Sequence, residues 1–329
     1  MNRLIPAAGF LLLTAMVIIL LGLTVYEAWI LSAGGGVLVV AVSVGTLIQM
    51  VREAKRVPCV QFGEAMNLTN ALNFLAVVAG ALITYILSID LGLGAVTASG
   101  LIGVLAALVI PDYAVPAYCG SFAGMSSARL LGSHWEIVLA GSIAGLIFIL
   151  TDCAYPGFGG KLGAIAFTGC VIMGLSLRRP FIVTPIPDPS VAMVIIIASV
   201  AATVATYWLS ITLGHGAVMA SGFVGLLGGL ILPAIYPDTG PLLAVMVICA
   251  SFSGMSSAAK FPSITMMLGA GLVTGVIFVY SMPQLGGAGG KLGTIAFASV
   301  MAVRSYYDLV ETRFDSLLQA RQPESGSQR

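Results

Sequence analysis

Long apolar stretches alternate with short polar or glycine-rich segments along most of the chain. A helix rises 1.5 Å per residue, so about 20 apolar residues cross a hydrocarbon core about 30 Å thick. Ten stretches approach or reach that length, and the shorter ones suggest burial among neighbouring helices. The predicted spans are Ile5–Val25, Trp29–Val51, Leu68–Ile89, Leu91–Ile110, Trp135–Thr151, Leu162–Leu177, Val191–Ile211, Gly214–Leu232, Ile264–Met282 and Leu292–Tyr306. This pattern predicts an all-α polytopic membrane protein.

Two further apolar pieces, Val115–Ala128 and Leu242–Ala259, contain related decapeptides. Cys119 to Ala128 reads CGSFAGMSSA, and Cys249 to Ala258 reads CASFSGMSSA, with eight of the ten positions identical. Glycine and serine interrupt the apolar pattern at the same places in both copies. Irregular backbone at membrane depth is tolerated only inside protein or beside a water-filled cavity. We therefore predict two short broken or re-entrant segments.

Two other motifs are also duplicated. LGLGAVTASG at Leu91–Gly100 returns 122 residues later as LGHGAVMASG, and GGKLGAIAF at Gly159–Phe167 returns 130 residues later as GGKLGTIAF. Internal repeats of this kind indicate duplicated structural units. The sequence thus predicts two tandem homologous halves. We divide the chain into an N-terminal two-helix extension at 1–55, a first membrane repeat at 56–178, a second at 179–304 and a cytoplasmic tail at 305–329.

The placement of lysine and arginine distinguishes two topologies. If the motif segments re-enter on one side, twelve of these residues are cytoplasmic, only Lys161 and Lys291 lie outside, and the halves are parallel. If the segments span, the division is ten against four and the halves are inverted. The positive-inside rule favours the first arrangement, with both termini in the cytoplasm. A compact chain without large loops is typical of a bacterial inner membrane protein.

Composition agrees with the apolar pattern. The chain is 59% hydrophobic and 8% charged, whereas soluble proteins average about 25% charged residues. A net charge of +1 gives no electrostatic reason to expect nucleic acid. The five cysteines form no CxxC pair and do not suggest a disulfide framework. The N-terminal apolar run is too long for an ordinary signal peptide, so we expect a first span there.

The duplicated decapeptides are the first candidate site. Glycine permits a bend, serine hydroxyls donate or accept hydrogen bonds, and broken helices form ligand sites in many transporters. The predicted pathway residues are Ser121, Phe122, Gly124, Ser126 and Ser127 with Ser251, Phe252, Gly254, Ser256 and Ser257. The alternative is small-residue helix packing. Joint replacement of Ser126 and Ser256 would distinguish the two, because a pathway role changes flux more than folding.

The GGKLG loops are the second candidate site. A lysine among exposed backbone N–H groups attracts anions, which gives Lys161 and Lys291 a role in selecting an anionic solute. The alternative is a tight turn whose lysine extends to lipid headgroups.

Two titratable residues differ between the copies. Asp90 corresponds to Thr212, and His215 corresponds to Leu93. Asp90 and His215 are candidates for a proton relay or a pH sensor. The alternative is that both occupy solvated ends of spans.

Known catalytic signatures are missing from the sequence. There is no P-loop, no GxGxxG in a βαβ context and no HExxH, and the chain contains only two histidines. We therefore predict no enzyme activity, no cofactor and no metal site.

The expected function is membrane transport. We expect a channel, or a facilitative or Na⁺-coupled carrier, that moves a small polar or anionic solute between two pseudo-symmetric halves. Scarce charge inside the spans argues against proton coupling. The alternative is a non-transporting integral subunit that anchors or assembles with a partner complex. The expected partners are the lipid bilayer and a small molecule or ion; a homo-oligomer and a partner membrane subunit both stay open.

Overall fold

The computed structural model describes residues 4–55 and 67–321, which form helices joined by turns and short loops. No strand occurs in these ranges, although Ile182 and Gly286 form one isolated bridge. The prediction of an all-α membrane-like fold is confirmed. The helices are α1 (Leu4–Leu31), α2 (Ala33–Ala54), α4 (Leu68–Tyr85), α5 (Ala95–Val109), α6 (Ala114–Gly124), α7 (His134–Leu150), α8 (Lys161–Ser176), α9 (Pro189–Tyr207), α10 (Ala217–Ile235), α11 (Gly240–Gly254), α12 (Ile264–Ser281) and α13 (Lys291–Arg321).

Fewer helices than the predicted ten meet the requirements for a membrane span. Within the described ranges, six are long and apolar enough: Ala7–Leu31, Ala33–Ala54, Leu68–Asp90, Pro189–Thr212, Ala217–Ile235 and Ile264–Ser281. The apolar helices α5, α7, α8 and α11 are shorter. Glycine and proline explain the length of α5, which starts after Gly94 at φ 78° and stops before Pro111.

The last predicted span also has a different role. Leu292–Tyr306 is the first half of α13, and its residues Ile295 to Ala302 are almost entirely buried. An apolar run that is buried on all sides belongs to the protein interior rather than to a lipid-facing surface. The helix then continues without a break through the predicted boundary at 304 to Arg321. The predicted boundary at 55–56 adjoins residues outside the described ranges. Cys59 lies among those residues.

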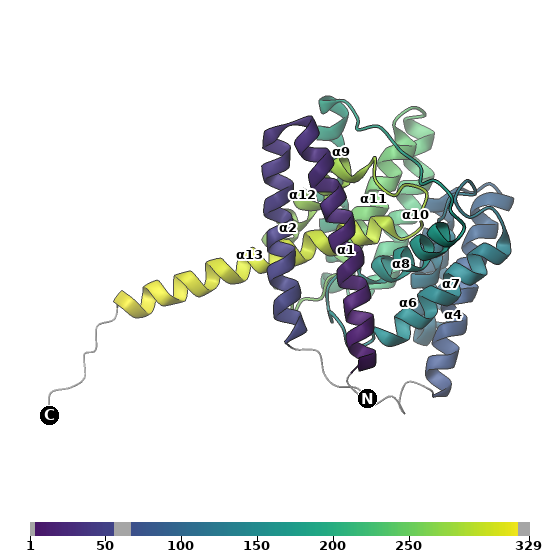
Figure 1. Cartoon of the computed structure of the whole chain (residues 1–329), viewed down its shortest axis with the longest axis horizontal. Helices are drawn as coiled ribbons and strands as arrows, with labels where there is room; N and C mark the ends of the chain where they lie inside the picture. Colours follow the sequence, from purple (N-terminus) through teal and green to yellow (C-terminus); the bar gives the residue numbers. More distant parts are fainter. Residues whose placement is uncertain (1–3, 56–66, 322–329) are drawn as a thin grey trace.

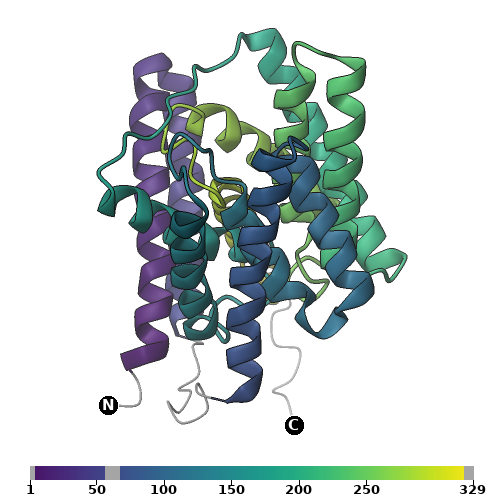
Figure 2. The ribbon, with the colours of Figure 1, turned by 90° about the vertical axis from the view of Figure 1, so that its right-hand side faces the viewer.

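The helices α4 and α9 begin at opposite ends of the molecule. In Figures 1 and 2, α4 starts at the lower end, whereas α9 starts at the upper end after the long connection from α8. Each helix ends in a π-helical turn, Ile86–Asp90 after α4 and Trp208–Thr212 after α9. Gly92 and Gly214 then adopt positive φ values of 70° and 73°, which only glycine adopts readily, and the chain turns back.

Helices α5 and α10 pack closely and antiparallel. A Cβ built on Gly100 would lie 2.5 Å from the backbone N of Leu226, and one on Gly222 would lie 2.8 Å from that of Val104. Further along, Gly229 approaches the backbone of Thr97. Residue numbers that increase along α5 are thus paired with residue numbers that decrease along α10, so the two helices run antiparallel. Small residues permit this approach of the two helices.

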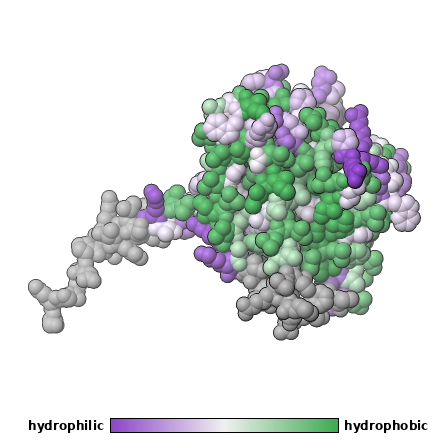
Figure 3. Space-filling model, viewed as in Figure 1, coloured by the Kyte–Doolittle hydropathy of each residue, from purple (hydrophilic) through white to green (hydrophobic). Residues whose placement is uncertain are grey.

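The outer surface is mainly apolar, and polar residues gather near the ends. Figure 3 shows hydrophobic residues over most of the face presented, with hydrophilic residues near the upper end and along α13. Helix α13 crosses α1 and α2 in Figure 1, and its C-terminal part extends beyond the bundle. Two ion pairs hold the end of α2. Arg52 pairs with Asp308 of α13 at 3.1 Å, and Glu53 pairs with Lys260 of the loop between α11 and α12 at 2.8 Å. An integral membrane location is consistent with this surface.

Candidate functional site

The duplicated decapeptides form the C-terminal ends of α6 and α11. Both helices stop at a glycine, Gly124 in α6 and Gly254 in α11, and a turn follows. A Cβ on Gly124 would lie 2.3 Å from the carbonyl oxygen of Ala81, and one on Gly254 would lie 2.5 Å from that of Thr203. The two glycines therefore permit helix ends that pack directly against α4 and α9.

The first serine of each decapeptide is sealed inside the protein. Ser121 and Ser251 have no exposed surface. The Ser121 hydroxyl pairs with that of Ser99 on α5 at 2.8 Å, and the Ser251 hydroxyl pairs with that of Ser221 on α10 at the same distance. Tyr118 joins this network across the molecule, because its hydroxyl lies 2.9 Å from that of Ser221. These serines hold helices together, and neither is among the residues that line the two central cavities described below.

The next serine of each copy connects to the glycine loop of the other copy. Ser126 accepts a hydrogen bond from the N–H of Gly289 at 3.0 Å, and Ser256 accepts one from the N–H of Gly159 at 3.1 Å. Both hydroxyls also donate to a carbonyl three residues earlier, at 2.8 Å. Ser126 and Ser256 are almost entirely buried. This reciprocal arrangement fixes each decapeptide against the opposite GGKLG loop.

Ser127 and Ser257 are the most accessible serines of the motif. The Ser127 N–H donates to the carbonyl of Gly287 at 2.9 Å, and the Ser257 N–H donates to that of Gly157 at 3.0 Å. Both side chains are partly exposed. Ser127 lines a cavity that is described below.

The GGKLG lysines point back at the helix that precedes their own. The ammonium of Lys161 donates to the carbonyls of Thr151 and Asp152 at 2.6 and 3.1 Å, just beyond the end of α7. The ammonium of Lys291 donates to the carbonyls of Ser281 and Met282 at 2.6 and 3.3 Å, at the end of α12. A cation near the C-terminal carbonyls of a helix is favourable because those groups carry partial negative charge.

Lys161 and Lys291 begin two helices that meet at their N-terminal ends. A Cβ on Gly163 would lie 2.4 Å from the Cα of Gly293, and the reverse construction gives 2.5 Å. Gly160 and Gly290 precede the two lysines with φ values of 81° and 84°. The GGKLG glycines therefore allow α8 and α13 to touch at the centre of the protein. The positive-inside rule had predicted both lysines at an outer surface, whereas Lys291 is only 9% exposed.

Two cavities of about 330 Å³ each lie beside these lysines. The Lys291 cavity is lined by α5, α11 and the loop that precedes α13. The Lys161 cavity is lined by α6, α10 and the loop that precedes α8. Matched positions of the two repeat copies line the two cavities: Ala95 and Val96 in one correspond to Ala217 and Val218 in the other. The cavities are thus duplicated as well, and residues from all three repeated motifs line both of them.

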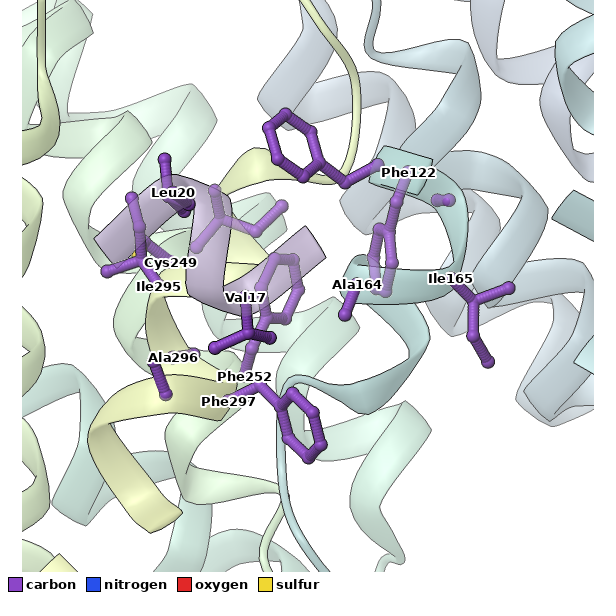
Figure 4. Packing of buried hydrophobic residues seen from close by; sticks show 14 of the residues in the cluster. Val17, Leu20, Phe122, Ala164, Ile165, Cys249, Phe252, Ile295, Ala296 and Phe297 are labelled. Atoms are coloured by element: carbon purple, nitrogen blue, oxygen red, sulfur yellow. The ribbon is translucent and has the colours of Figure 1, made fainter. Parts of the chain in front are cut away.

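Phe122 and Phe252 border both cavities. Their ring centroids are 4.4 Å apart, with an interplanar angle of 49°. Figure 4 shows them within the buried cluster that also contains Ala164 and Ile165 of α8 and Ile295 to Phe297 of α13. Each ring is 1% exposed. Of the predicted pathway residues, only this phenylalanine pair lines both central cavities.

Asp90 and His215 do not lie together. Asp90 pairs with His134 at 2.7 Å, and both side chains are substantially exposed at the end of α4. His215 is exposed and borders a separate surface hollow with Leu209, Met219 and Phe223. The pairing of Asp90 with His134 could not be predicted from the sequence, because His134 is 44 residues away and belongs to no repeated motif.

Three buried polar residues near the motifs were not predicted from the sequence. Tyr118 has no aromatic counterpart in the second copy, where Ile248 stands, yet it joins the two copies. Thr84 and Thr206, at matched positions before the π-helical turns, are buried with no hydrogen-bond partner for their hydroxyls. These threonines are 122 residues apart, the same offset as the LGLGAVTASG motif, and this offset is the sequence signal that could have identified them.

Comparison with known proteins gives no relative for this arrangement: no family model, curated protein or solved structure matches the chain. In the described ranges, no three histidine, cysteine, aspartate or glutamate residues are grouped as metal ligands would be. The cavities and the residues that line them are therefore the features that bear on function.

Proposed function

We propose that this protein moves a small solute across a membrane through the two central cavities. Their joint boundary at Phe122 and Phe252 carries the proposal, because it places two spaces of about 330 Å³ on either side of one narrow partition. A channel and a facilitative or Na⁺-coupled carrier both fit this arrangement. A small polar or anionic solute fits it too, since each cavity has one lysine at its wall.

The proposal includes two homologous halves in inverted orientation. Matched pairs of contacts support it: Ser126 and Ser256 each bond the opposite loop, and Gly163 meets Gly293. The antiparallel contact of α5 with α10 favours inversion, because equivalent helices related by an axis along the membrane normal would run parallel. In an inverted pair the two cavities open toward opposite sides. The phenylalanine pair would then be the barrier between them.

The location that goes with this proposal is a bacterial inner membrane. A charged cluster lies near the C-terminal end of α2, at one end of the molecule. It consists of Arg52, Glu53, Lys260 and Asp308. Clustered lysine and arginine favour the cytoplasmic side, so this end would face the cytoplasm.

Solute flux into proteoliposomes tests the proposal. Osmotic swelling is measured for urea, glycerol, sodium formate and sodium nitrate, with empty liposomes as the reference. We expect the wild-type protein to admit at least one of these solutes. Joint Phe122→Leu and Phe252→Leu substitution shortens both partition side chains and should increase that flux several-fold.

Phe223→Leu is the matched control, because Phe223 is 43% exposed on α10 and borders neither central cavity. Gel filtration of every variant shows whether it is folded. Flux no higher than that of empty liposomes for every solute contradicts the proposal. An equal increase in the control variant also contradicts it.

One observation favours a second candidate, a subunit that anchors a partner complex. The C-terminal part of α13 extends beyond the helix bundle (Figure 1), and Val310 on it is 69% exposed. Purification from native membranes distinguishes the candidates. A stoichiometric partner combined with no solute flux supports the anchoring subunit, whereas flux by the isolated protein supports transport.

A further inference from the structure

The two central cavities differ in charge. Lys161 and Asp152 both line the first, and Asp152 is exposed there. In the second cavity Met282 occupies the position that corresponds to Asp152, and Lys291 is the one charged residue among its lining side chains in the described chain. A carboxylate beside a lysine offsets its attraction for another anion. With its lysine protonated, the Lys291 cavity therefore has an excess of one positive charge, and the Lys161 cavity has none.

The ammonium of Lys291 retains capacity for a ligand. An ammonium has three N–H donors. In the described chain Lys291 uses two of them on the carbonyls of Ser281 and Met282. Lys291 also begins α13, so the first N–H groups of that helix lie beside it without intrahelical acceptors. A bound carboxylate would satisfy the third donor and would lie where the helix dipole favours negative charge.

The rest of the cavity wall is mainly apolar. Phe252, Phe278 and Leu242 line it together with Val245 and Ile295, around the single ammonium. At about 330 Å³ it lies at the lower end of the range of small-molecule sites, about 300–1,000 Å³. A wall of this kind suits a ligand with an apolar body and one acidic group, because a fully hydrated inorganic ion gains nothing from aromatic and aliphatic contacts.

We infer that the Lys291 cavity binds a small monocarboxylate with an apolar body, and that the Lys161 cavity does not. This inference rests on the proposed function, in which the two cavities are consecutive parts of one pathway. It assigns the solute to the monocarboxylates and makes the two ends of the pathway different. The anion binds on the Lys291 side of the phenylalanine pair, because Met282 there replaces the carboxylate that Asp152 places beside Lys161.

Binding of two fluorinated probes tests the inference. Titration of the purified protein in zwitterionic detergent is followed by ¹⁹F NMR with 4-fluorobenzoate and with its neutral analogue 4-fluorobenzamide. We expect one site that binds the carboxylate at least tenfold more tightly than the amide. Lys291→Met should remove that preference, whereas Lys291→Arg should retain most of it because the charge remains.

The twin lysine controls for a structural effect. Lys161 caps α7 as Lys291 caps α12, so Lys161→Met and Lys291→Met remove equivalent contacts. We expect both substitutions to lower thermal stability by similar amounts and only Lys291→Met to weaken carboxylate binding. In addition, Asp152→Met gives the Lys161 cavity the same charged residue content as its twin and should create a second carboxylate site.

Three results would overturn the inference: equal affinity for the two probes, no detectable binding of either, or unchanged carboxylate affinity in Lys291→Met. The proposed function fails separately. If proteoliposomes pass urea or glycerol but the carboxylate does not bind at Lys291, transport stands and the inference falls. If the carboxylate binds and no solute crosses the membrane, the site stands and transport falls.

Discussion

Single residues in the centre of the molecule act mainly by satisfying buried polar groups. Ser126 and Ser256 accept the N–H groups of Gly289 and Gly159 while they donate to carbonyls of their own segments. An unsatisfied buried donor costs more than a typical hydrogen bond gains. The hydroxyls of the motif therefore have a structural role in this conformation, in contrast to the pathway lining that the sequence suggested.

Serine replacement tests this structural role. Ser126→Ala and Ser256→Ala each leave one buried N–H without its acceptor, so each should lower the free energy of unfolding by about 1–3 kcal/mol. Thermal or denaturant unfolding of the purified protein measures the loss. Ser142→Ala is the control, because its hydroxyl bonds only to Val138 within α7. Stable variants with altered flux would instead restore the pathway interpretation.

The glycine contact between α8 and α13 gives a second prediction at this scale. Gly163→Ala places a methyl group 2.4 Å from the Cα of Gly293, so the two helices must separate. Overpacking of this kind costs about 1–3 kcal/mol, and here backbone would have to move. Gly22→Ala in α1 has nothing within 4 Å and is expected to be neutral or mildly stabilising. Comparable melting temperatures for the two variants would contradict the close contact.

At the scale of elements, α2 is tied to the remainder of the chain by the Glu53–Lys260 pair. The Glu53 side chain is 2% exposed and that of Lys260 is 16% exposed. The ammonium also lies 4.6 Å from the ring centroid of Phe158. The pair is shielded from water, so removal of Lys260 takes a cation away from a carboxylate that is itself almost entirely buried.

Charge removal tests this connection. Lys260→Met should destabilise the protein by more than the ~1 kcal/mol at most that an exposed pair contributes, and adding Glu53→Gln should recover part of that loss. The exposed Asp90–His134 pair is the comparison, because His134→Ala should cost about 1 kcal/mol or less. Unfolding in denaturant measures the loss for all three variants against the wild-type protein. If the two single substitutions had equal effects, the Glu53–Lys260 pair would not be an anchor of α2.

The sequence revealed the helical class and the repeated motifs, since apolar length and identical decapeptides are local features. It did not reveal which helices would be too short to span, because Gly94 and Pro111 act through backbone geometry rather than through hydropathy. Nor did it reveal the cavities, whose walls come from positions scattered over five or more segments. Phe122 and Phe252 were selected from the motif, but their contact depends on how α6 and α11 meet.

At the scale of the whole molecule, the proposed pathway requires two cavities that approach the phenylalanine pair from opposite faces. Thr184 is exposed at the wall of the Lys291 cavity, and Asp152 is exposed at the wall of the Lys161 cavity. The two positions therefore report on the two openings independently.

Sided thiol labelling measures this directly. Thr184→Cys and Asp152→Cys are introduced separately into a protein in which Cys59 and Cys153 are serine, and a membrane-impermeant maleimide is added to sealed right-side-out or inside-out vesicles. We predict that each cysteine is labelled from one face only, and that the two faces are opposite. Labelling of both cysteines from the same face would contradict the inverted, two-sided pathway.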